Sequence, residues 1–153
     1  MDTQNEIFKN EMYKFLQQEG AYYYTFKHLQ SVAILDSPDG KIRIVNWNIE
    51  YPDMSYAYAG FIMIKENKNI RIVALNDVHD AYSKKPKGTV DFSDWYGALY
   101  YKIIPFENGN KTEYLLLGWD GGTAGSNYKI MDVLVLGKRS VRFGSPVFIS
   151  ENK

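Results

Sequence analysis

Residues 76–80, Asn-Asp-Val-His-Asp, place two carboxylates beside an imidazole. A neighbouring carboxylate can fix the tautomer of a histidine ring and raise its basicity, which general-base catalysis requires. We therefore take Asp77, His79 and Asp80 as candidate catalytic residues. The sequence favours a competing interpretation, in which both aspartates cap a turn and His79 is merely exposed.

Asp120 is the remaining catalytic candidate. It follows the apolar run 114–119, so its carboxylate would lie at a strand end beside the Trp119 indole, and the glycines after it would let a ligand approach the backbone. The alternative is a turn over 120–122 with Trp119 packed in the core. A hydrolase of unknown substrate would combine Asp120 with Asp77, Asp80 or His79.

Aromatic rings beside short polar side chains provide a second kind of candidate site. A ring can stack on a ligand while a neighbouring Asn or Asp hydrogen-bonds it, although most such rings serve as core residues or cross-strand partners. Asp91 or Asp94 with Asp120 would also suit a carboxylate pair for glycoside hydrolysis, but that reaction depends on a separation that the sequence does not fix. The candidate ligand-binding residues are Trp47, Asp94, Trp95 and Trp119.

Composition argues against several functions. The 18 Lys and Arg residues balance 18 Asp and Glu and are dispersed, so we expect no nucleic-acid partner, and residues 84–87, the densest basic stretch, should form a solvated loop. With no cysteine and only two histidines, His28 and His79, we expect no metal site and no cofactor. Motifs of nucleotide-binding proteins, serine hydrolases and zinc proteases are absent.

No membrane or export segment is evident either. No apolar run approaches the roughly 18 residues that a membrane helix needs, so we expect no transmembrane segment and a soluble chain. Residues 1–6 are too polar and acidic for a signal peptide.

The elements that must position these residues begin with an amphipathic helix, predicted over about residues 3–19. Thr3 and Glu6 have the spacing of a capping box, and Gly20 supplies the left-handed position that ends many helices. One apolar stripe runs along the helix and consists of Phe8, Met12, Phe15 and Leu16.

From about residue 32 to 149 the apolar period changes to two, which is typical of strands. The run 56–64 is apolar on both alternating faces and is predicted to be a central strand. The Asn-Gly at 108–109 predicts a hairpin between 98–106 and 112–119. Residues 129–136 fit a strand or a helical turn, and we prefer the strand.

Three segments do not follow this two-residue apolar period. Residues 76–96 are polar and without a clear period, which indicates a functional loop or a covering flap. Residues 120–127 are predicted to be a flexible glycine-rich loop. The last strand, 141–149, contains Gly144 and Pro146, which indicate an edge or a bulge, and a homo-oligomer could form through such an open edge.

A family resemblance is carried by three stretches, SPDGKIRIVNW at 37–47, WYGALYYKIIP at 95–105 and LLLGWDG at 115–121. They resemble a family of uncharacterised, exported bacterial proteins, over about residues 30–149. The resemblance implies a periplasmic or secreted protein, and relatives that often continue past 146–148. Because the family has no established activity, it implies no role for any residue.

Together these patterns predict one α+β domain over residues 1–153, with an N-terminal helix packed on an antiparallel meander of about six to eight strands. The predicted function is a non-enzymatic binding or structural module of the bacterial envelope. Its partner would be a small molecule, a glycan or a protein. The hydrolase is the alternative.

Overall fold

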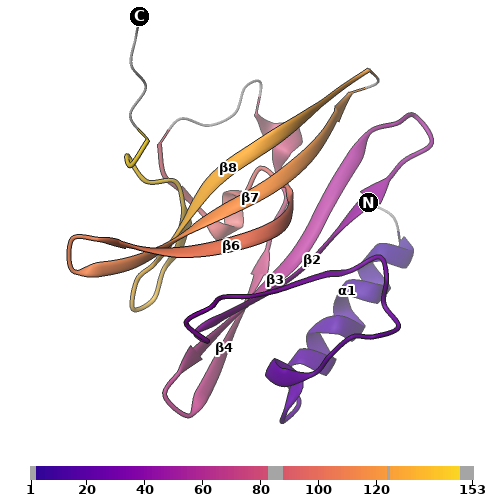
Figure 1. Ribbon diagram of the computed structural model, residues 1–153. Coiled ribbons are helices and arrows are strands. Elements are labelled where there is room, and N and C mark those ends of the chain that lie inside the picture. The colour runs from indigo at the N-terminus through magenta and orange to yellow at the C-terminus, as the bar shows by residue number, and fades with distance from the viewer. Residues whose placement is uncertain (1–2, 83–87, 124, 149–153) are drawn as a thin grey trace, which may run out of the picture.

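The computed structural model describes residues 3–82, 88–123 and 125–148, which form three layers (Figure 1). In this part of the chain no helix has the length and apolar character to cross a membrane. The elements are α1 (Thr3–Leu16), η1 (Ala21–Tyr23), β1 (Ala33–Asp36), β2 (Ile42–Glu50), β3 (Tyr56–Glu66), β4 (Asn69–Leu75), η2 (His79–Ala81), β5 (Val90–Asp91), η3 (Phe92–Asp94), β6 (Leu99–Asn108), β7 (Lys111–Thr123), β8 (Ser126–Leu136) and β9 (Val141–Phe143).

The strands form two sheets, one in the order β1-β2-β3-β4 and the other in the order β5-β9-β8-β7-β6, and every strand pair is antiparallel. The predicted α+β class with one N-terminal helix is confirmed. The predicted number of strands, six to eight, was too low, because the irregular segment 76–98 contributes β5. The predicted single meander is two sheets, because the same segment carries the chain from one sheet to the other.

Two apolar cores lie between the three layers. One separates the sheets and takes side chains from both, such as Ile44 and Ile62 from the first sheet and Leu116 and Leu134 from the second. The other lies between α1 and the outer face of the first sheet. β3 is central, as predicted, and its alternating side chains enter both cores. The first sheet is therefore covered on both faces, as Figure 1 shows.

The helix places its predicted apolar stripe against the first sheet, with Met12 and Leu16 buried there. It ends at Leu16, three residues earlier than predicted, because the backbone tightens: Gln18 N–H donates to Phe15 O, three residues back. Gly20, with a φ of 81°, then turns the chain into η1.

A buried asparagine joins the two sheets. Asn46 on β2 is fully buried, and its Oδ1 accepts the Tyr100 N–H at 2.8 Å, while its Nδ2 donates to Tyr100 O at 3.2 Å and to Ala33 O at 3.4 Å. The register of β6 against β7 shifts between Tyr100 and Lys102. Such a bulge turns a peptide group away from its own ladder, and here Asn46 supplies the missing partner.

The glycine-rich segment differs from the predicted flexible loop. β7 continues to Thr123 and β8 begins at Ser126, with Asp120 opposite Tyr128 in the register. Glycine is needed here because the Tyr56 ring packs closely against the backbone, and not because the segment is flexible. A Cβ on Gly121 would lie 2.2 Å from that ring. Residues 129–136 are a strand, as predicted.

The last strand was also misplaced. β9 ends at Phe143 and lies between β5 and β8, so it is not an edge, because the two residues of β5 pair with it. Pro146 follows it outside any strand, as its missing N–H requires. The predicted basic loop at 84–87 and the predicted strand end at Ile149 lie outside the described residues.

Candidate functional site

The structure places three of the catalytic candidates in one pocket and connects the fourth, Asp120, to that pocket through Tyr58. Asp77, His79 and Asp80 line a pocket of about 370 Å³ at the end of the first sheet. Asp120 comes from the other sheet and reaches the same place through Tyr58, whose hydroxyl donates to Asp120 Oδ1 at 3.1 Å. The site thus lies where the ends of β3, β4 and β7 meet.

Asp77 is the most constrained of these residues. Its side chain is only 7% exposed, and its Oδ2 accepts the Tyr58 N–H at 2.8 Å. Its Oδ1 accepts the His79 N–H at 3.0 Å and contacts His79 Nδ1 at 2.7 Å. The carboxylate therefore caps the turn, as the competing interpretation predicted, and also orients the imidazole, as catalysis would require.

His79 lies between two carboxylates. Its Nε2 is 3.0 Å from Asp80 Oδ1, on the side opposite Asp77, and its side chain is 36% exposed. The hydrogen bond with Asp77 raises the pKa of His79 above its ordinary value, burial lowers that pKa, and the negative charges of Asp77 and Asp80 raise it further. The protein therefore stabilises the protonated ring relative to a free imidazole.

Tyr58 connects the two sheets beneath the pocket. Its oxygen accepts the Gly121 N–H at 2.8 Å while its O–H donates to Asp120, whose Oδ1 also accepts the Gly122 N–H at 2.9 Å. Burial, above all, raises the pKa of the Tyr58 phenol, and the Asp120 charge adds to that effect. Tyr58 therefore remains a neutral hydrogen-bond donor.

The irregular segment is held in place by its own backbone. Asn76 N–H donates to Phe92 O at 3.2 Å, and Val78 N–H donates to Trp95 O at 2.8 Å, so residues 76–78 lie beside 92–95. Gly97, with a φ of 82°, brings its backbone against the site: a Cβ there would lie 2.6 Å from Tyr58 Cδ2 and 2.8 Å from Asp77 Oδ1. Residues 76–78, 92–95 and Gly97 are therefore a built part of the site.

The aromatic candidates are placed differently. Trp95 is fully buried and donates to Tyr100 OH at 3.0 Å, and Trp47 is 4% exposed and donates to Asn5 Oδ1 at 2.9 Å, so neither ring can stack on a ligand in this structure. Trp119 is half-buried and packs edge-on against Tyr56, 5.1 Å between centroids. Asp94 is exposed and does not line the pocket.

Sequence reasoning missed Tyr58 and Gly97, the two residues on which the site depends most. Tyr58 was recognised only as a strand residue, although a tyrosine on the core face of a strand needs a partner for its hydroxyl. Gly97 was not singled out, and its signal, a glycine between Tyr96 and Ala98, is weak.

The described residues include no group of three or more His, Asp or Glu side chains that could hold a metal ion.

Comparison with known proteins identifies no relative: no family model, no curated protein and no solved structure matches the chain. The resemblance to exported bacterial proteins therefore stays a prediction.

The ion pairs of His79 predict a pH-dependent stability. Because the folded-state pKa is raised above 6.5, protonated His79 stabilises the fold at pH values below about 6.5, and this contribution is lost as the pH rises through the folded-state pKa. Urea unfolding across this range should show a free energy of unfolding that falls as the pH rises. His79→Gln should remove this fall, whereas His28→Gln, at an exposed position outside the pocket, should keep it. An unchanged slope in His79→Gln would contradict the assignment.

Proposed function

We propose that this protein is a non-enzymatic binding module whose ligand site is the pocket beside His79, and that, as the resemblance implies, it works in the bacterial envelope. The observation that carries the proposal is the internal bonding of Asp77, Tyr58 and Asp120. Both oxygens of Asp77, the Tyr58 hydroxyl and Asp120 Oδ1 bond to one another or to backbone N–H groups. Such bonding builds a rigid floor, which favours binding over proton transfer.

The absence of a nucleophile at the histidine supports the same proposal. Within the described residues, no hydroxyl is hydrogen-bonded to His79, whose ring nitrogens contact only aspartates. Ser55 also lines the pocket, but its hydroxyl donates to Asp53. A nucleophile activated by histidine must lie within hydrogen-bond reach of it, although that contact is often looser without substrate.

The pocket rim indicates the kind of ligand. Asp80 is 95% exposed in its side chain, and Asn76 uses its Nδ2 on Ser93 O, which leaves its Oδ1 to accept. Tyr51 and Tyr56 add ring surface beside these acceptors. A small polar molecule with hydroxyl or ammonium donors and a flat apolar face would satisfy both features.

A hydrolase is the second candidate, and one observation favours it. The 2.7 Å contact between Asp77 and His79 Nδ1 is the arrangement that orients a general base, and Nε2 faces the exposed Asp80. In this alternative, His79 would activate a water molecule, and Asp80 would rotate away from Nε2 first.

One experiment separates the two. Protein-observed NMR with a library of small polyols and amines should find binders that shift the amide signals of 76–80, without turnover of chromogenic esters or glycosides. Asp80→Asn should weaken those binders about tenfold, as expected for loss of a charged hydrogen bond, while Asp94→Asn should leave them unchanged. Turnover that is lost in His79→Gln, together with a library that yields no binder, would replace the binding module by the hydrolase.

A further inference from the structure

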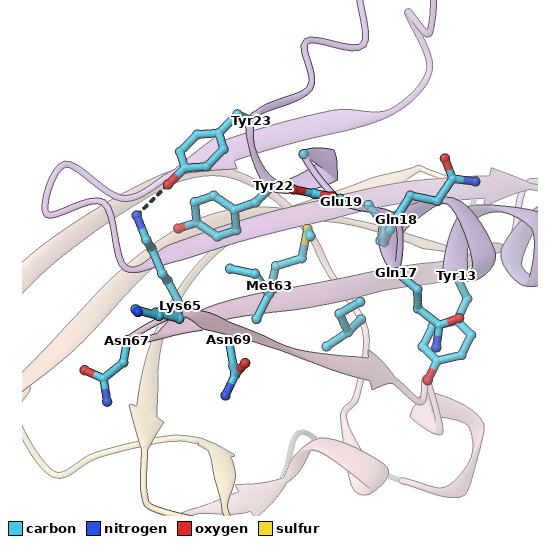
Figure 2. Close-up of a pocket in the computed structure, with 15 residues that line it drawn as sticks. Tyr13, Gln17, Gln18, Glu19, Tyr22, Tyr23, Met63, Lys65, Asn67 and Asn69 are labelled. Carbon is cyan, nitrogen blue, oxygen red and sulfur yellow. Dashed lines mark hydrogen bonds between the residues drawn. The ribbon is translucent and has the colours of Figure 1, made fainter.

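A second hollow, with a volume of about 660 Å³, lies away from the His79 pocket. It is bounded by the C-terminal end of α1, the turn at 17–20 with η1, and the hairpin between β3 and β4, as Figure 2 shows. None of the candidate catalytic or ligand-binding residues predicted from the sequence lines this hollow.

The hollow combines an apolar floor with aromatic walls and a polar rim. Leu16 and Met63 form part of the floor and are almost completely buried. Tyr13 and Tyr23 expose 40% and 64% of their surface beside it. Four amide side chains lie around the hollow, namely Gln17, Gln18, Asn67 and Asn69. Rings beside several amides suit a ligand that has apolar C–H faces and many hydroxyls, which is the chemistry of a sugar.

The ammonium group of Lys65 lies at one end of the hollow and is held there by Tyr23. Lys65 Nζ bonds to Tyr23 OH and lies 5.2 Å from the centroid of the Tyr23 ring and 6.0 Å from that of Tyr22 (Figure 2). Within the described residues its ammonium forms no ion pair with a carboxylate. A neutral hydroxyl holds the ammonium in place without neutralising its charge, so Lys65 can still attract an anionic group.

The wall that holds this lysine is fixed to the sheet. Arg43 binds Asp36 through two nitrogens, at 2.6 and 2.9 Å, and donates to Tyr24 O at 2.6 Å. Tyr22 OH donates to Gly40 O at 2.9 Å. These bonds fix η1 and its tyrosines before any ligand arrives, which lowers the entropy lost on binding.

We propose that this hollow binds a sugar that carries a single carboxylate, of the uronic-acid type, with the carboxylate on Lys65 and the sugar ring between the exposed rings of Tyr13 and Tyr23. A simple anion would not use the four amides, and a neutral sugar would not use the charge of Lys65. Glu19 also lines the hollow and disfavours a second anionic group on the ligand. This site is independent of the one proposed beside His79.

Isothermal titration with the monosaccharides galacturonate and glucuronate, each of which carries one carboxylate, matched by neutral galactose and glucose, tests the proposal. The acidic sugars should bind the wild-type protein more tightly than their neutral counterparts, and added salt should reduce the difference. Lys65→Met should weaken the acidic sugars about tenfold and leave the neutral ones unchanged. The matched control is Lys129→Met, because Lys129 also lies over a tyrosine ring, Tyr101 at 5.4 Å, but on β8 and outside the hollow.

Three results would overturn the proposal: equal affinity for acidic and neutral sugars, no binding of any acidic sugar at millimolar concentration, or equal losses in Lys65→Met and Lys129→Met. Asp80→Asn should not affect acidic-sugar binding. If Asp80→Asn abolishes it, the sugars occupy the His79 pocket instead, and the present inference is wrong while the proposed function stands.

Discussion

Replacing Asn46 by alanine is expected to lower the free energy of unfolding by about 3 kcal/mol, because the substitution leaves the buried Tyr100 N–H without its acceptor and removes a donor from Tyr100 O. An unpaired polar group in a dry core costs its full desolvation penalty, and water cannot reach a residue that is fully buried. Urea unfolding, followed by circular dichroism, measures the change.

The matched control is Asn48→Ala. Asn48 lies two residues further along β2, so it faces the same side of the sheet, but it is only half-buried and makes no side-chain hydrogen bond within the described residues. Its replacement should change the free energy of unfolding by less than about 1 kcal/mol. If the two variants lose the same stability, Asn46 does not join the sheets in the way described.

Replacing Gly97 by alanine is expected to cost about 3 kcal/mol and to disturb the candidate site itself. About 1 kcal/mol comes from the left-handed backbone, which disfavours a Cβ, and the rest from contacts of 2.6 Å with Tyr58 and 2.8 Å with Asp77. Because one of these side chains must move, the Asp77–His79 hydrogen bond should weaken. The pKa of His79, followed by NMR, should fall toward its ordinary value.

Gly20→Ala separates the two contributions. Gly20 has a φ of 81°, almost the same as that of Gly97, but a Cβ there would meet nothing within 4 Å. This variant should cost only about 1 kcal/mol and leave the pKa of His79 unchanged. Equal losses at both glycines would show that backbone conformation, and not close packing, makes Gly97 necessary.

Local patterns in the sequence predicted most of the elements correctly. The apolar stripe of α1, the two-faced character of β3 and the Asn-Gly hairpin between β6 and β7 each depend on residues a few positions apart. The division into two sheets and the place of β9 could not be predicted in this way. They depend on a two-residue strand, β5, whose pairing with β9 no local period reveals.

In the candidate site, too, contacts between residues close in the sequence could be predicted, and contacts between distant residues could not. The contact between Asp77 and His79 follows from their spacing of two, so the sequence could nominate it. The bond between Tyr58 and Asp120 joins residues 62 positions apart and exists only because the two sheets pack face to face. The burial of Trp47 and Trp95 likewise follows from three-layer packing, which placed both rings in cores.

The order of the strands also bears on how the chain folds. Each sheet is built from one uninterrupted stretch, 33–75 for the first and 90–143 for the second, and all pairs except β5 with β9 join strands that follow one another. Short hairpin loops close with little loss of chain entropy, so both sheets can form early. The slow event is then their docking, in which the Tyr100 peptide must find Asn46 across the interface. Refolding in a single exponential phase, slowed in Asn46→Ala and unchanged in Asn48→Ala, is the kinetic signature expected of such a late docking step.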